Sequence, residues 1–290
     1  ASSAASDVYK RQIIFFSGTL LATYAPKLPS GMKKIFLFFL LIINVSFISA
    51  VNDIEKLYDE LDAVLLRRDE ICLRKEACID SIKNMKTHYM SNAELFELYS
   101  KVFDEYYTYR SDSALYYLSL MDEVALKSGA DSYVHLCKIN RSLLLATTGY
   151  FSQSLDILNS IERNKIDKSL LLDYFSAYEW VYSVWSEYSA NDDFSIDFKD
   201  KEVLYIDSML MVMNPSSKEY MYFSGELAAR KGKQPEAQKF YEKALQGLII
   251  DTRLYACVTC GLAFAHKRQG NMHEYEKYLV MSAISDITCP

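Results

Sequence analysis

The sequence predicts an all-α protein built from repeated helical hairpins. Half of its 290 residues are hydrophobic and 14% are aromatic, so the chain is able to bury a large core. Only nine Gly and five Pro are present, too few turn residues for a fold of many short strands. Small and aromatic residues also recur at set intervals, which is typical of helical repeats.

The first 50 residues are expected to lie outside this fold. Residues 32–50, MKKIFLFFLLIINVSFISA, combine two lysines, an apolar run and small residues before Val51, which is the pattern of a secretory signal peptide. The apolar run is shorter than the roughly 20 residues that cross a membrane, although a retained signal anchor is an alternative. We interpret residues 1–31 as a non-native or untranslated leader, with a true extended leader as the alternative. The product is therefore expected to be exported to the periplasm.

The remaining body is acidic. Without residues 1–50 it carries 27 basic and 37 acidic side chains, a net charge of about −10. Because such a surface repels phosphate groups, we expect no nucleic acid partner for this segment. The six cysteines follow no dense disulfide framework, and a core of this size does not need one.

The stretch GELAARKGKQPEAQKFYEKAL, residues 225–245, resembles a tetratricopeptide repeat (TPR), a pair of antiparallel helices. Small residues let two helices approach closely, and an aromatic ring one turn further on fills the remaining gap. The resemblance implies that the signature residues form this packing seam: Gly225, Gly232, Ala237, Tyr241 and Ala244. Weaker copies place Gly149 and Gly270 at the position of Gly232.

One equivalent position of the repeats is occupied by Ala114, Ser154, Ala237 and Tyr275, at intervals of 40, 83 and 38 residues. The double interval predicts a hidden repeat, with helices within residues 170–189 and 201–213. We therefore expect a superhelix of about five hairpins over residues 91–290, truncated at its C-terminal end because no polar cap follows the last repeat. Residues 51–90 carry apolar residues at helical spacing and are expected to form N-terminal capping helices.

No sequence motif indicates catalysis. The chain has no GxSxG elbow, no HExxH pair and no phosphate-binding loop. Cys257 and Cys260 form a CxxC, but a redox site of this kind normally follows a strand, so we interpret the pair as packing residues and keep a thiol enzyme as a remote alternative. His266 and His273 lack a third metal ligand. We expect neither an enzyme nor a cofactor or metal.

The resemblance to TPR proteins implies a concave groove, lined by the first helix of each hairpin, that binds a protein or peptide. The positions that carry over are mostly apolar or aromatic, which suits a hydrophobic peptide or helix: Phe96, Tyr99, Phe103, Tyr106, Leu136, Ile139, Leu143, Tyr222 and Phe264, with Glu226, Cys257 and Cys260 beside them. The alternative is that these aromatic residues form the core of an irregular superhelix that closes its own concave side.

The order of segments is similar to the exported half of a family of uncharacterised Bacteroidetes regulators. The resemblance is carried by the signal and by LRRDEICLRKEACIDSIK, ELYSKVFDEYYTYRSDSALYY and GYFSQSLDIL. Its members resemble membrane-tethered transcriptional regulators, with periplasmic repeats, one transmembrane helix and a cytoplasmic DNA-binding domain. The resemblance implies a periplasmic sensor that meets the membrane only through a signal anchor or a missing C-terminal span. The alternative is a free-standing periplasmic adaptor or glycan-uptake accessory protein.

Overall fold

The computed structural model describes residues 53–189 and 195–289, and within these ranges the chain is helical and contains no strand. The predicted all-α class is confirmed; the predicted leader and signal peptide, residues 1–50, lie outside the described residues. A first helix spans residues 53–66. It is followed by α3 (Arg68–Lys83), α4 (Asn92–Tyr107), α5 (Ser111–Ser128), α6 (Asp131–Thr147), α7 (Phe151–Asn159), the 3₁₀ turn η2 (Lys168–Leu170), α8 (Leu171–Tyr188), α9 (Ser195–Val212), α10 (Lys218–Arg230), α11 (Gln234–Leu245), α12 (Arg253–Arg268) and α13 (Met272–Thr288).

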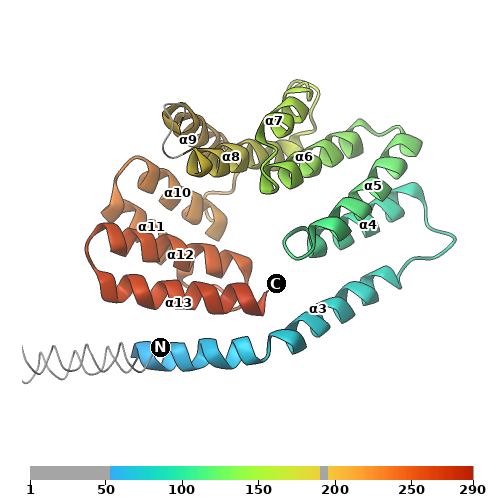
Figure 1. Ribbon diagram of the computed structural model, residues 1–290. Helices are drawn as coiled ribbons and strands as arrows, with labels where there is room; N and C mark the ends of the chain where they lie inside the picture. Colours follow the sequence, from blue (N-terminus) through green and yellow to red (C-terminus); the bar gives the residue numbers. More distant parts are fainter. Residues whose placement is uncertain (1–52, 190–194, 290) are drawn as a thin grey trace, which may run out of the picture.

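Successive helices pair into hairpins: α4 with α5, α6 with α7, α8 with α9, α10 with α11, and α12 with α13. The described part of the chain thus holds the predicted five hairpins, and α8 with α9 is the hidden repeat that the double interval indicates. Figure 1 shows the hairpins following one another along an arc. The first helices of hairpins that are distant in sequence face the inner side of this arc.

The seam between α10, α11 and α12 is built around one aromatic ring. Tyr241 of α11 is 1% exposed and packs with Ala237 and Ala244 in the core of this part of the array. A Cβ atom added to Gly225 of α10 would lie 2.5 Å from Cε1 of Tyr241, and one added to Gly261 of α12 would lie 2.8 Å from the same atom. Two helices can approach the ring this closely only because both positions are glycine.

Three of the glycines assigned by sequence to the packing seam have a different role. Gly149, Gly232 and Gly270 have φ values of 88°, 76° and 80°, and a Cβ atom on any of them would meet no neighbour within 4 Å. They occupy the turns of three hairpins, α6 with α7, α10 with α11 and α12 with α13. In these turns a backbone N–H donates to a carbonyl near the end of the first helix, as Lys233 N does to Ala228 O at 2.9 Å. Glycine is needed there because other residues rarely adopt this left-handed conformation.

The N-terminal helices contact both ends of the array. Ile79 of α3 is fully buried against α4, as expected for a cap on the first hairpin. Residues 53–71, however, pack on the last hairpin, where Val64 and Ile71 join Val280 and Ile284 of α13 in one apolar cluster. The N-terminal segment therefore runs across the open side of the arc, as Figure 1 shows, and covers a face of α13 for which the sequence indicated no cap.

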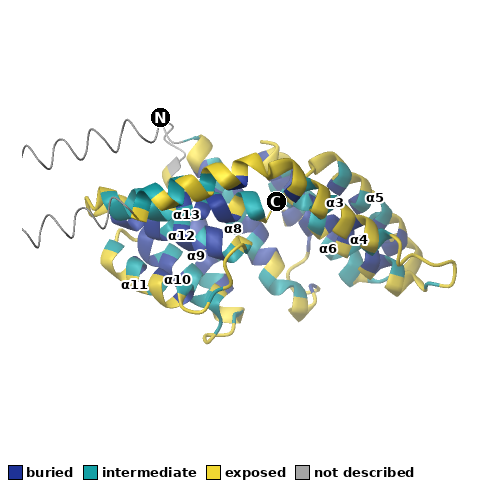
Figure 2. Cartoon of the chain, turned by 90° about the horizontal axis from the view of Figure 1, so that it is seen from below, coloured by how far each residue is buried: buried dark blue, intermediate teal, exposed yellow. Residues whose placement is uncertain are grey.

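Buried residues run along the whole array rather than gathering in one centre. Figure 2 shows them between neighbouring helices, with exposed residues on the outer surfaces. Separate apolar clusters lie around α4 and α5, around α6 to α9, and around α10 to α12. This is the packing expected of a repeat array, in which each hairpin is stabilised mainly by its neighbours.

Candidate functional site

The first hairpin does not present the groove that the sequence predicts. Phe96, Tyr99, Phe103 and Tyr106 are 2–8% exposed and form the core between α3, α4 and α5. Phe96 also stacks on Tyr133 of α6 at a ring separation of 3.9 Å. The alternative interpretation, that these aromatic residues are core, is correct for this part of the chain.

The physical reason is the N-terminal segment. Lys83 Nζ at the end of α3 donates a hydrogen bond to the hydroxyl of Tyr106 at 2.8 Å, and Lys86 Nζ does the same for Tyr99 at 2.8 Å. The apolar side of α3 covers the face of α4 that an open superhelix would leave exposed. Ile139 is likewise fully buried, and Leu136 packs against the core of the first hairpin.

A cavity that is lined by groove positions lies further along the array, and we call it the inner pocket. It is a cavity of about 660 Å³, within the range of about 300–1,000 Å³ that is usual for ligand pockets. Most of its lining comes from the first helices α8, α10 and α12, with Leu143 of α6 and Tyr107 of α4 at its margin. Three of the predicted groove residues, Leu143, Tyr222 and Phe264, are brought together there, as are Glu226, Cys257 and Cys260.

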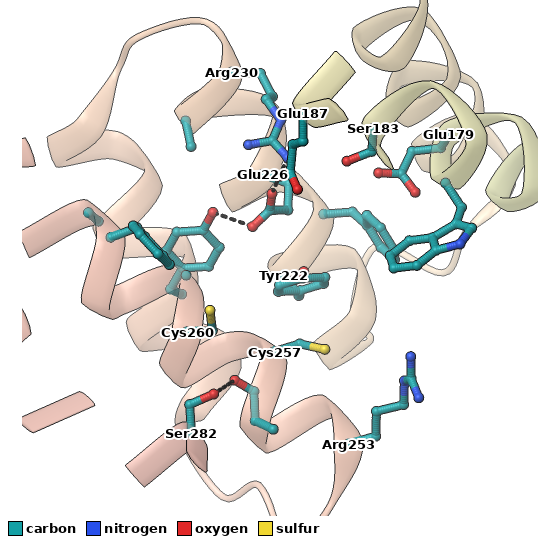
Figure 3. A pocket seen from close by; sticks show the side chains of 18 of the residues that line it. Glu179, Ser183, Glu187, Tyr222, Glu226, Arg230, Arg253, Cys257, Cys260 and Ser282 are labelled. Carbon is teal, nitrogen blue, oxygen red and sulfur yellow. Dashed lines mark hydrogen bonds and ion pairs between the residues drawn. The ribbon is translucent and has the colours of Figure 1, made fainter. Parts of the chain in front are cut away.

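A network of charged groups fixes one wall of the inner pocket. Arg230 Nε donates to Glu202 Oε1 at 2.7 Å, and the Arg230 guanidinium also lies 3.6 Å from Glu226 Oε2. The hydroxyl of Tyr241 donates to Glu226 Oε1 at 2.7 Å. Figure 3 shows Glu226 beside Arg230. The ion pair ties α9 to α10; its Glu202 carboxylate is 1% exposed, whereas the Arg230 side chain is 27% exposed.

Glu179 of α8 faces the same pocket without a partner. Within residues 53–189 and 195–289, no hydrogen bond or ion pair is formed by its carboxyl group, and Figure 3 shows it next to Ser183, apart from Arg230. Burial, together with the nearby carboxylates of Glu202 and Glu226, raises the pKa of Glu179 to about 8, against the opposing effect of Arg230. The pocket therefore contains an acid that is costly to ionise in the empty state.

The two pocket cysteines are poorly suited to thiol chemistry. Cys257 and Cys260 lie one turn apart on α12 and are both free. Burial is the main cause that raises the pKa of Cys260 to about 11, and it raises the pKa of Cys257 as well. Since thiol exchange requires the thiolate, these surroundings oppose it at neutral pH.

Nothing in the described part of the chain is arranged as a metal site. His266 is buried and stacks on Tyr278, and no group of three or more His, Cys, Asp or Glu residues among the described ones is placed to hold a metal ion. No helix in residues 53–189 and 195–289 combines the length and the apolar character that a membrane span requires.

Comparison with known families agrees with this architecture. A family model described as the SusR N-terminal TPR domain matches residues 65–290. The chain belongs to this family. Among proteins of curated function, none matches it. The matched range of this SusR-type TPR domain includes all five hairpins, α3 and the whole lining of the inner pocket.

Several residues of the pocket could not be found from the sequence. Glu179, Trp180 and Glu187 lie on α8, in the hidden repeat, where large aromatic side chains replace the small residues of the signature. Glu202 and Arg230 are distant in sequence and gain their role only from the contact between α9 and α10. The spacing that revealed the hidden repeat was the one signal that pointed to this region.

Proposed function

We propose that this SusR-type TPR domain is a non-enzymatic module that binds a protein or peptide in its inner pocket, and that it forms the exported sensor part of a membrane-tethered transcriptional regulator. The observation that supports binding most directly is the pocket itself, a cavity of about 660 Å³ on the inner side of the arc. Its aromatic residues Trp180, Tyr222 and Phe264 offer apolar surface, and its charged wall offers hydrogen-bonding groups. This combination is typical of peptide-recognition grooves.

The closed arrangement of the array supports a sensor role. A ligand held between α8, α10 and α12 contacts several hairpins at once, so binding favours one curvature of the arc over others. Residues 53–71 link the last hairpin to α3 and hence to the first one. A change of curvature would therefore alter the contact between α13 and this segment, which directly follows the predicted signal peptide in sequence. That contact is our candidate for the element that transmits the ligand-bound state.

Binding is tested with a peptide selected from a random display library on the purified full chain. Phe264 is 42% exposed and lines the pocket, whereas Leu126 of α5 is 77% exposed and lies outside it. A charge at position 264 removes apolar contact from the pocket, so Phe264→Asp should weaken the peptide by about tenfold or more, and Leu126→Asp should not. Equal binding of the peptide to both variants would show that the peptide does not bind in the pocket.

The exported location is tested separately by reporter fusions after residue 289. Alkaline phosphatase is active only outside the cytoplasm, and green fluorescent protein fluoresces when it is retained inside. We expect an active phosphatase fusion and a dark fluorescent one. Long-read sequencing of the native locus then distinguishes a regulator from a free-standing adaptor. A regulator requires the frame to continue into about 20 apolar residues and a basic helical domain.

A further inference from the structure

The inner pocket is lined by more carboxyl groups than guanidinium groups. Its carboxylates are Glu179, Glu187, Glu226 and Asp286, with Glu202 buried beside them. Its guanidinium groups are Arg230, Arg253 and Arg268, one fewer than the four carboxyl groups that line it. Glu187 and Asp286 are exposed, and so are Arg253 and Arg268, so water screens the charges of all four. Figure 3 shows Arg253 well apart from Arg230 and Glu226. The excess of carboxyl groups therefore lies on the wall formed by α8 and α10, where Glu179 and Glu226, with Glu202 buried beside them, have Arg230 as their one guanidinium group among the described residues.

Arg230 cannot neutralise that wall alone. Its Nε atom is bonded to Glu202, and its other contact in this network is Glu226. Glu226 is also bound to the Tyr241 hydroxyl, so the positions of these groups are fixed. Glu179 is left facing the cavity with no cation within hydrogen-bonding distance among the described residues. A carboxyl group in such a place is stabilised strongly by any cation that enters.

A second acceptor in the same pocket also lacks a donor. Oε1 of Gln234 is buried and accepts no hydrogen bond from the described residues, whereas its Nε2 donates to Ala229 O at 3.2 Å and so fixes the orientation of the amide. Gln234 lines the same cavity as Glu179. An unsatisfied buried oxygen destabilises the empty pocket, and a ligand carrying N–H donors would remove that cost.

We infer that the inner pocket receives a positively charged group, a lysine or arginine side chain of the bound protein or peptide, which pairs with Glu179 while its alkyl stem lies against the aromatic lining. The inference rests on the proposed function and names the ligand chemistry of that same pocket. An anionic group would be repelled by the wall of α8 and α10, and a purely apolar one would leave the Glu179 carboxyl without a partner. Trp180, Tyr222 and Phe264 add surfaces that attract cations.

The test uses peptides selected from an unbiased display library on the purified full chain. We expect lysine or arginine to be enriched at one position. The selected peptide is then synthesised in two forms, with its lysine retained or replaced by norleucine; for a selected arginine, citrulline takes the place of norleucine. The unmodified peptide should bind the wild-type chain about tenfold or more tightly than the neutral form, as expected for a hydrogen-bonded charged group.

Two variants assign the effect to Glu179. Glu179→Gln keeps the shape of the side chain and should reduce the preference for the charged peptide to about twofold or less, since the charge pair is absent. Glu123→Gln removes the same charge from α5, where the side chain is 66% exposed and outside the pocket, and should keep the full preference. Thermal unfolding of both variants checks that each is folded.

Each outcome has one meaning. If no peptide binds the full chain, the proposed function fails and this inference fails with it. If peptides bind the pocket but the charged and neutral forms bind equally, the proposed function stands and the inference is wrong. If the preference for charge persists in Glu179→Gln, Glu179 does not pair with the cation, and the assignment is overturned.

Discussion

The ring of Tyr241 on α11 occupies the space that a side chain at Gly225 on α10 would need. A Cβ atom at Gly225 would lie 2.5 Å from Tyr241 Cε1, far inside normal contact distance. The ring is not free to withdraw, because Gly261 of α12 approaches it as well. The hydroxyl of Tyr241 in turn holds Glu226 in the wall of the inner pocket. The packing seam of the repeat and the candidate site therefore share one residue.

The first prediction concerns this contact. Gly225→Ala should lower the free energy of unfolding by about 1–3 kcal/mol through overpacking, less the gain of up to about 1 kcal/mol that Ala brings to a helix. Chemical denaturation measures the change. In a Tyr241→Leu background, which removes the ring, the substitution should become neutral or stabilising.

Gly232→Ala is the matched control for that experiment. Its cost, about 1 kcal/mol, arises from the φ of 76° and from no neighbouring atom. The cost should therefore be the same with Tyr241 or Leu at position 241. Equal behaviour of the two glycine variants in both backgrounds would show that Tyr241 does not restrict position 225.

The second prediction concerns pH. Because the pKa of Glu179 is raised to about 8 in the folded chain, the folded state holds its proton where the unfolded state has lost it. Its contribution to stability is present at low pH, decreases from about pH 4.5 to 8 and is constant above that. Asp104, Asp173 and Asp286 have raised pKa values and act in the same direction.

The comparison of wild type with Glu179→Gln isolates the one group. Urea unfolding between pH 5 and pH 9 should show a steeper loss of stability in the wild type, by up to a few kcal/mol over the range. The groups that face Glu179 from neighbouring helices are Glu202, Glu226, Arg230 and Tyr222, and they are unchanged in the variant. Parallel curves for the two proteins would contradict the raised pKa.

The third prediction concerns the CxxC. In single-cysteine variants at pH 7.5, Cys260 should react with iodoacetamide at least tenfold more slowly than Cys78, because its pKa of about 11 leaves little thiolate and Cys78 is exposed. A faster reaction at Cys260 than at Cys78 would contradict this prediction and would favour the thiol-enzyme alternative.

The fourth prediction concerns the N-terminal helix. Val64 is 9% exposed against α13, whereas Leu66, on the same helix, is 88% exposed. Val64→Asp buries an unpaired charge and should release residues 53–71 from the last hairpin, with cleavage of this segment by protease accelerated about tenfold or more. Leu66→Asp should leave the cleavage rate unchanged. If both variants are cleaved at the wild-type rate, the contact with α13 does not hold the segment.

The sequence predicted the repeats well because their register depends on local packing. Ala114, Ser154 and Ala237 are each fully buried in the second helix of a hairpin, and their spacing alone located α8 and α9. The groove of the first hairpin was predicted wrongly at Tyr99 and Tyr106, because the transfer of positions assumed an open face. No local pattern shows that α3 returns to cover α4.

The charged wall of the pocket could not be predicted from the sequence either. Glu179, Glu202 and Arg230 come from three helices, and a glutamate on a helix is usually solvated. Their proximity follows from how α8, α9 and α10 pack, and the periodicity of apolar residues within one helix does not specify that packing. Only Glu226 was placed at the groove by the repeat register, since it lies one turn after Tyr222 on α10.

Binding in the inner pocket is tested most directly by mapping where a bound peptide lies. A display-selected peptide carrying a photoreactive group is crosslinked to the purified full chain, and the attachment sites are identified by mass spectrometry. If the peptide binds in the inner pocket, crosslinks should form to the pocket faces of α8, α10 and α12 and should be lost in Phe264→Asp. Crosslinks confined to the outer helices α5, α7 and α9, and unaffected by that substitution, would contradict binding in the inner pocket.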